Sequence, residues 1–323
     1  MGTIRNILIV AQDGRLQYEA LLFAASLRHF PENRDLRLVV AEPQPGPLWP
    51  DDPRISRPAI RRELRALGAD IVPLHSKHFG ARYPQGNKLE ALALLPKAEP
   101  FAFFDTDTLV TGPLADVVAV PPTASQRVEP TWPREPLYGP STAQIWGALY
   151  DRFGLDMAQT LDTRFGADDW RRYLYFNAGW FTGTCPHSLG ARLLDYAAQI
   201  ERDPPPELAT QALFPWLDQI VLPLAIAAEG GGRRDTGLDG AKSLHYRALP
   251  EIYAYGSDQA VATLEAVTRA PHLWDIFNQY VSFRRMIFKE NGPALRQIMA
   301  ARPTPLKYLA RKAAIMDAGH WVR

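Results

Sequence analysis

Short apolar segments alternate with amphipathic segments through the first third of the chain, and this alternation is the feature that most limits its fold. The apolar runs cover residues 6–10, 36–40, 71–74 and 101–104. Between them the sequence has helical periodicity; after the first run, Tyr18, Leu21, Leu22 and Ala25 share one helical face. Strands that are apolar on both faces and alternate with helices predict a parallel sheet covered by helices on both sides.

The rest of the chain has a less regular pattern. Helices are predicted at 141–153, 188–200 and 217–228, and strands at 175–182 and 244–246. From residue 281 onward the chain is basic and amphipathic, and Pro303 and Pro305 separate two helical stretches. The sequence therefore predicts an α/β fold with a helical extension at its C-terminal end.

The composition is that of a folded chain without a marked charge bias. With 323 residues and 46% hydrophobic content, it can bury a large core. A formal net charge of +1 argues against nucleic acid as a partner, and the single cysteine, Cys185, can form no internal disulfide. We find neither a secretory signal pattern nor the roughly 20 apolar residues of a membrane-spanning helix. We therefore expect a cytoplasmic protein.

Two aspartates follow the last apolar run, in the segment FAFFDTDTLVTGPL. Because side chains at positions i and i+2 of an extended chain point to the same side, Asp105 and Asp107 should present two carboxylates together. Such groups repel each other unless a cation or a proton lies between them. Three interpretations are open: a divalent-metal site for a diphosphate, the nucleophile and acid/base pair of a haloacid-dehalogenase-type phosphatase, or a turn that caps its own backbone.

Four motifs in order resemble those of a known enzyme family. They lie in the segments NKLEALALLPKAEPFAFFDTDTLVTGPL, FNAGWFTG and LDQIVLPLAI. This order resembles the retaining GT-A glycosyltransferases of the glycogenin and lipopolysaccharide galactosyltransferase type (family 8-like). In that family a helix with a basic residue precedes a strand ending in Asp-x-Asp, followed by an Asn-[Ser/Ala]-Gly strand and an Asp-Gln pair that opens a helix. The resemblance covers about residues 7–246 and implies the GT-A-type nucleotide-diphospho-sugar transferase fold, with a mostly parallel central sheet flanked by helices.

The resemblance also implies a metal site. Asp105 and Asp107 would bind Mn²⁺ or Mg²⁺, which would hold the donor diphosphate, and Thr106 would belong to the donor site with them. The family's third ligand is a histidine in a His-Phe-x-Gly-x-x-Lys-Pro-Trp segment. The candidate is His245 in SLHYRALP, which lacks the Gly and the Lys-Pro-Trp, and its competitor is His272 in HLW. A lone histidine can also be purely structural.

Further residues would contact the donor sugar. Lys88 would reach the sugar or a phosphate, unless it is only a solvated lysine at a helix end. Asn177 would hydrogen-bond the sugar, while Ala178 and Gly179 keep the strand small where the ligand approaches. The loop after the first strand, with Ala11 and Asp13, corresponds to the place where the family holds nucleobase and ribose; Asp13 could instead simply form an Asp-Gly turn.

An Asp-Gln pair and an Asp-Asp pair bear on catalysis. Asp218 and Gln219 would lie beside the sugar, with Gln219 opposite the leaving group, although Asp218 could instead be a helix N-cap. An inverting enzyme would need a carboxylate base for the acceptor hydroxyl, and Asp168 and Asp169 are the candidates. A retaining enzyme needs no such base, and the resemblance implies retention.

These observations predict a metal-dependent glycosyltransferase that moves a hexose from a nucleoside diphosphate sugar, a UDP-sugar, to a glycan, lipid-linked or protein acceptor. Residues 1–125 would form the nucleotide-sugar-binding half and residues 126–280 the acceptor-binding half of one domain. One alternative is a non-catalytic nucleotide-sugar-binding protein of the same fold. The phosphatase is disfavoured because its aspartate pair normally follows the first strand, whereas this pair follows the fourth.

Residues 281–323 form the basic tail, for which two roles are open. A basic helix with an apolar face can lie on an anionic membrane, here the inner membrane face, which would suit a lipid-linked acceptor. The apolar face could instead pack on the catalytic domain and leave the charges in solvent.

Overall fold

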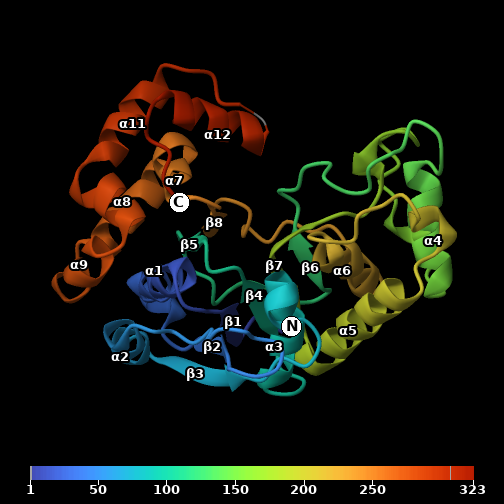
Figure 1. Ribbon diagram of the computed structural model, residues 1–323, viewed down its shortest axis with the longest axis horizontal. Helices are drawn as coiled ribbons and strands as arrows, with labels where there is room; N and C mark the ends of the chain where they lie inside the picture. Colours follow the sequence, from blue (N-terminus) through green and yellow to red (C-terminus); the bar gives the residue numbers. More distant parts are fainter. Residues whose placement is uncertain (1, 306) are drawn as a thin grey trace.

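The computed structural model describes residues 2–305 and 307–323, and the strands within them form two sheets (Figure 1). The larger sheet has six strands in the order β3-β2-β1-β4-β7-β6. Its parallel part consists of β1 (Asn6–Val10), β2 (Arg37–Pro43), β3 (Ala69–Leu74) and β4 (Phe101–Phe104). These strands coincide with the four apolar runs, so the predicted α/β fold with a mostly parallel sheet is confirmed.

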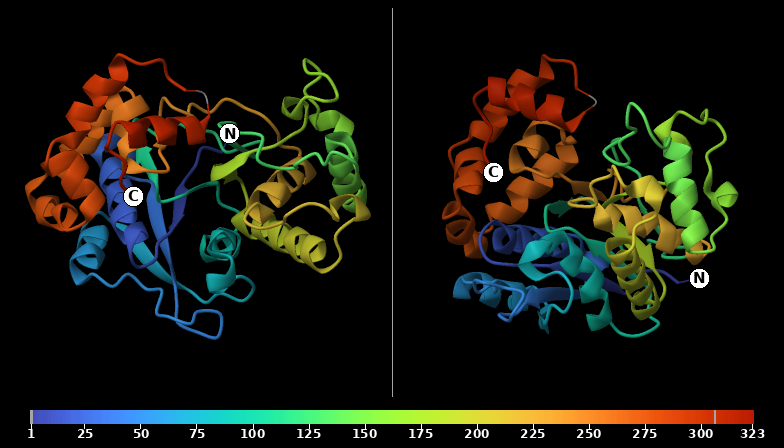
Figure 2. Two further views of the ribbon diagram at one scale, coloured as in Figure 1. Left: turned by 45° about the horizontal axis from the view of Figure 1, so that its top comes forward. Right: turned by 45° about the vertical axis from the view of Figure 1, so that its right-hand side comes forward.

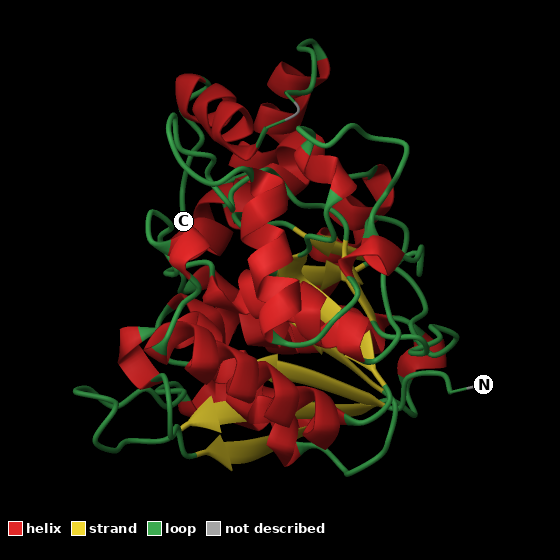
Figure 3. Cartoon of the chain, turned by 90° about the vertical axis from the view of Figure 1, so that its right-hand side faces the viewer, coloured by secondary structure: helices red, strands yellow, loops and turns green. Residues whose placement is uncertain are grey.

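Helices cover both faces of this sheet, as its apolar strands require. Because side chains alternate along a strand, Ile7 and Ile9 of β1 belong to one apolar core and Leu8 to the other. The Ile7 side is covered by α1 (Arg15–His29) and α2 (Pro58–Ala66). The Leu8 side is covered by α3 (Asn87–Ala91), α5 (Pro186–Arg202) and α6 (Leu217–Ala228). Figure 3 shows helices packed against the strands.

The second half of the chain adds antiparallel strands. β7 (Asn177–Gly183) pairs with β4 and with the short β6 (Thr123–Ser125), both antiparallel. β5 (Thr108–Val110) and β8 (Ser243–His245) form a separate antiparallel pair, in which Thr108 lies opposite His245. The sequence pattern predicts neither β5 nor β6, because three residues are too few to reveal a period. The β5–β8 pair brings a distant segment of the chain to the end of β4.

The remaining helices lie at the two sides of the molecule. α4 (Thr142–Arg152) begins after Ser141, whose side chain forms a capping box with Gln144. The C-terminal helices are α7 (Leu249–Tyr255), α8 (Asp258–Thr268), α9 (Pro271–Asn278), α10 (Val281–Phe283), α11 (Asn291–Ala300) and α12 (Tyr308–Asp317), with a π-helical segment, Arg284–Phe288, after α10. They gather on the side of α1, away from α4, α5 and α6 (Figure 2).

The tail packs most of its apolar face on the rest of the protein. Its buried apolar residues are Phe283, Met286, Ile287, Leu295, Met299, Ile315 and Val322. They belong to the same core as α1 and the Ile7 face of the sheet. The tail therefore packs on the catalytic domain as the second of the two predicted roles requires, while Val281, Ile298, Leu309 and Met316 remain exposed. Among the described residues, no helix is both long and apolar enough to cross a bilayer.

Candidate active site

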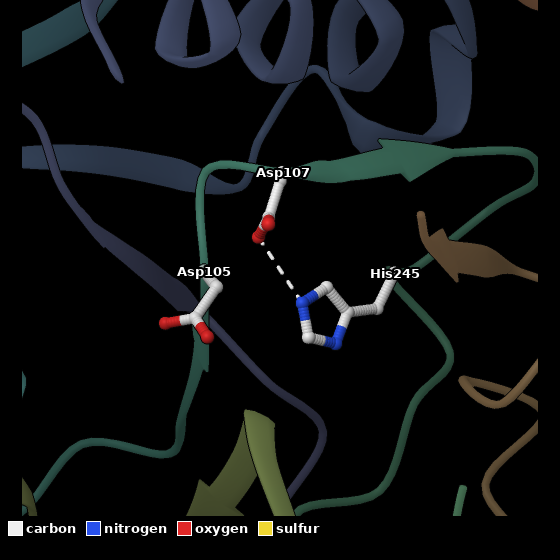
Figure 4. A group of neighbouring side chains, drawn as sticks. All are labelled: Asp105, Asp107 and His245. Atoms are coloured by element: carbon white, nitrogen blue, oxygen red, sulfur yellow. Dashed lines mark ion pairs between the residues drawn. The ribbon is translucent and has the colours of Figure 1, made fainter. Parts of the chain in front are cut away.

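Asp105 and Asp107 lie where β4 ends and the chain turns into β5. The Asp105 backbone N–H donates to the Gly179 carbonyl oxygen at 2.8 Å, which ties this turn to β7. One ligand atom each from Asp105, Asp107 and His245 lie within 4.8 Å of one another (Figure 4). His245 Nε2 is 3.1 Å from Asp107 Oδ1. Two carboxylates and an imidazole are a ligand set that fits Mn²⁺ or Mg²⁺.

The carboxylates of this turn face charged side chains. Asp105 contacts Lys88, while Asp107 contacts His245 and lies 3.8 Å from Arg15 Nη1. In the described part of the chain, neither carboxylate accepts a backbone N–H of the turn, so the self-capping interpretation is wrong. The competing histidine, His272, is exposed on α9.

Lys88 is buried, and three oxygen atoms surround its ammonium group. Nζ is 2.9 Å from Asp105 Oδ1 and 3.1 Å from Asp218 Oδ2, and it donates to the Ala178 carbonyl oxygen at 3.0 Å. Its side chain is only 8% exposed. The interpretation of Lys88 as a solvated lysine is therefore wrong. The ammonium group of Lys88 thus contacts the end of β4, the start of α6 and strand β7.

Asp218 lies in the first turn of α6 and is not its N-cap, which is Trp216. Asp218 Oδ1 accepts a hydrogen bond from the Tyr83 hydroxyl at 2.7 Å, and the Tyr83 oxygen accepts the Asp218 backbone N–H at 2.9 Å. The other carboxylate oxygen contacts Lys88. Both oxygens are thus engaged, and Asp218 holds the lysine in place. Gln219, the next residue, is half-buried.

The charges of this network shift one another's pKa values. Burial alone lowers the pKa of Lys88, but Asp105 and Asp218 outweigh it, so the pKa lies above its ordinary value. Burial raises the pKa of Asp105, against the effect of Lys88. The lysine therefore stays protonated at any physiological pH and can act as a fixed positive charge.

The opposite end of the cluster carries a surplus of acidic groups. Burial opposes ionisation of Asp107, but His245 and Arg15 hold its pKa below the usual range. Glu19, which accepts a hydrogen bond from Thr106 at 3.3 Å, has its pKa raised to about 8 by burial and by the charge of Asp107. Arg15 contacts both Glu19 and Asp107, and a cation bound between Asp105 and Asp107 would offset the repulsion between these two carboxylates.

Strand β7 passes close behind His245. A Cβ atom at Gly179 would lie 2.2 Å from His245 Nδ1 and 2.7 Å from Asn177 Oδ1, so only glycine fits here. Asn177 Oδ1 accepts the Gly179 N–H at 2.8 Å. Among the described residues its Nδ2 group has no hydrogen-bond partner, so this donor is free for a ligand.

A cavity of about 330 Å³ opens beside the aspartates. Lys88, Asp105, Thr106 and Asp107 line it, as do eight further residues: Val10, Gln12, Arg15, Leu16, Pro84, Gln85, Phe103 and Arg323. Of these, only Gln12 and Arg15 had a local signal, because they follow the first parallel strand, where ligands of such sheets bind.

Other predicted residues lie outside this cavity wall. Ala11 is fully buried, and Asp13 accepts a hydrogen bond from Gln17 at 2.6 Å. Asp169 forms an ion pair with Arg171 and lines a separate groove with Asp168. The structure therefore does not bring these residues together with the Asp105 cluster.

A mostly parallel sheet carries paired aspartates at the carboxyl end of a central strand, with a histidine and a cavity beside them, and this is the arrangement expected of the predicted GT-A-type fold. The chain belongs to the Rhodobacterales glycosyltransferase domain family, whose model matches residues 7–230. Its family is one of glycosyltransferases, as the motifs predict, and the phosphatase interpretation is wrong.

Among curated proteins, no sequence matches the chain. Among solved structures it is similar to the glycosyltransferase GlyE of Streptococcus pneumoniae TIGR4, with 14% identity and a TM-score of 0.42 over 90% of this chain and 64% of GlyE. It is also similar to the galactosyltransferase LgtC in complex with donor and acceptor sugar analogs, with 16% identity and a TM-score of 0.44 over 84% of this chain and 99% of LgtC. The chain thus spans less than two thirds of GlyE, and the family assignment rests on the family match.

Proposed function

We propose that the protein transfers a hexose from a UDP-sugar to a glycan, lipid-linked or protein acceptor, using Mn²⁺ or Mg²⁺ held by Asp105, Asp107 and His245. The convergence of these three residues beside a buried lysine and a cavity carries the proposal. When bound, the ion would neutralise the donor diphosphate and the charge that develops on the leaving group. Residues 1–125 would hold the donor and residues 126–280 the acceptor.

The residues around the metal ligands would bind and orient the donor. Lys88 supplies a second positive charge for the diphosphate or sugar, and Asp218 fixes its position. The free amide of Asn177 donates a hydrogen bond to the sugar. Gln219 lies next to the anomeric carbon, on the face opposite the leaving group.

The reaction proceeds with retention of the anomeric configuration in this proposal. An inverting transfer would need a carboxylate base, and the Asp169 carboxylate is paired with Arg171 outside the donor cavity. An NMR spectrum of the product decides this point. A retained anomer is expected, and an inverted anomer would move the base to Asp168 or Asp169.

The metal role is tested with Asp107→Asn. Because the amide removes a charged ligand, transfer and metal-dependent UDP binding should both be lost, while the circular dichroism spectrum stays that of the wild type. Asp195→Asn, which changes an exposed aspartate on α5, should keep both activities. Full transfer by Asp107→Asn, or undiminished transfer by the wild type in excess EDTA, contradicts the proposal. UDP binding without any turnover would instead favour a non-catalytic binding protein.

A further inference from the structure

A second cavity, of about 170 Å³, lies beside His245. His245 lines this cavity as well as belonging to the metal-ligand cluster, whereas Asp105 and Asp107 line the donor cavity. A group bound in the second cavity would therefore lie next to the place of transfer. Since the donor is assigned to the first cavity, the second is placed to receive part of the acceptor.

Three arginines from three separate segments line this second cavity. Arg127 follows β6, Arg247 follows β8 by two residues, and Arg311 lies on α12. A guanidinium group presents planar pairs of N–H donors that match the oxygens of a phosphate or carboxylate. Three of them around one small cavity therefore favour an anionic group.

The acidic residues of the cavity occupy two of the arginines. Arg247 Nη1 is 3.9 Å from Glu129 Oε1, and Arg311 Nε is 3.3 Å from Glu251 Oε2. The guanidinium of Arg127, by contrast, forms no hydrogen bond or ion pair within residues 2–305 and 307–323. One arginine is thus left to bind a ligand, beside two that are already held in place.

Both the backbone and the side chain of Arg247 are held in a defined conformation. Its backbone has φ 59°, in the left-handed region that non-glycine residues rarely adopt. Its guanidinium lies over the ring of Tyr308, 4.9 Å from the ring centre, and the Tyr308 backbone N–H donates to Glu129 at 2.7 Å. The start of α12 therefore closes one side of the cavity and orients its arginine.

We propose that this arginine cavity binds an anionic group of the acceptor, a phosphate or a sugar carboxylate, next to the hydroxyl that receives the hexose. This inference rests on the proposed function, because it takes the first cavity to be the donor site. It restricts the acceptor to glycans or lipid-linked sugars that carry such a group near the attachment point.

The test uses the full chain saturated with UDP and Mg²⁺, so that probes cannot enter the donor cavity. Glucose 6-phosphate, glucuronate and glucose are titrated by calorimetry. We expect at least one of the two anionic sugars to bind at least about tenfold more tightly than glucose. The sugar that binds more tightly shows whether the cavity prefers a phosphate or a carboxylate. Equal binding of all three sugars, or no binding by any of them, overturns the proposal.

Variants assign the binding to the cavity. Arg127→Gln should weaken binding of the anionic probe about tenfold and leave glucose binding unchanged. Arg127→Lys should weaken binding of the anionic probe less, because lysine keeps the positive charge. Arg302→Gln, which changes an exposed arginine of the same tail, is the matched control. An equal loss in Arg302→Gln, or no loss in Arg127→Gln, overturns the proposal. Failure of UDP and Mg²⁺ to bind the wild type would instead contradict the proposed function.

Discussion

At the scale of single residues, the site depends on contacts that admit almost no substitution. Lys88, Asp105 and Asp218 form one buried charge network, in which removing a partner leaves another charge uncompensated. His245 has a different constraint, because its ring lies directly against the backbone of β7. The position of the proposed third metal ligand therefore depends on a glycine that itself binds nothing.

Gly179→Ala tests this steric constraint. The added methyl group would lie 2.2 Å from His245 Nδ1, so the ring must leave its present position relative to the aspartates. We expect Mn²⁺ affinity to fall about 10–100-fold, as when a residue that orients a ligand is changed. Gly147→Ala, on α4 with no atom within 4 Å of the new Cβ, is the control and should bind Mn²⁺ normally. Calorimetric Mn²⁺ titration measures both variants, and unchanged affinity in Gly179→Ala would remove His245 from the metal site.

At the scale of elements, the tail contributes side chains to the folded core. Leu295 of α11 is fully buried, whereas Leu309 of α12 is 74% exposed. Leu295→Ala should lower the free energy of unfolding by about 2–5 kcal/mol, because it leaves a cavity. Leu309→Ala should change it by less than about 0.5 kcal/mol. Urea denaturation compares the two, and equal effects would mean that the tail does not pack as described.

The contact between α7 and α12 predicts a pH dependence. Burial raises the pKa of Glu251 to about 7 despite the nearby Arg311, whereas its ordinary value is 4.5. The folded state therefore binds the proton of the Glu251 carboxyl group more tightly than the unfolded state does. The stabilisation from this protonation is full below pH 4.5 and is lost as the pH rises to about 7.

Glu251→Gln removes this titration. Between pH 4.5 and pH 7.5, its free energy of unfolding should rise by up to about 3 kcal/mol relative to that of the wild type. The measurement is urea denaturation at both pH values, with Glu32→Gln on an exposed glutamate as the control. A constant difference between Glu251→Gln and the wild type would show that folding does not raise the pKa of Glu251.

At the scale of the whole molecule, the proposed site lies between the sheet, α1 and the C-terminal end of the chain, so a ligand there should stabilise the fold as a unit. UDP with Mn²⁺ at about 100 times its dissociation constant should add about 2.7 kcal/mol to the free energy of unfolding. The melting temperature should rise with both present and fall back on addition of EDTA. An equal rise with UDP in EDTA would argue against a metal-dependent donor site.

The sequence by itself determined the parallel sheet, most helix positions and the paired aspartates at the end of β4. These features are local: a strand shows its burial in its own composition, and positions i and i+2 share a side without help from the rest of the chain. The order of the Asp-x-Asp, Asn-Ala-Gly and Asp-Gln motifs was likewise enough to predict a glycosyltransferase.

The tertiary structure alone decided how those motifs meet. Tyr83 and Asp218 are 135 positions apart, and no local pattern signals that one orients the other beside Lys88. His245 reaches the aspartates only because β5 and β8 pair; the strand at 244–246 was predicted, but β5 is too short to be read from periodicity and no local pattern shows that the two strands pair. The arginine cavity is assembled from three distant segments, each of which looks like ordinary basic surface in the sequence. Proximity between distant residues is set by packing, and packing is a property of the whole fold.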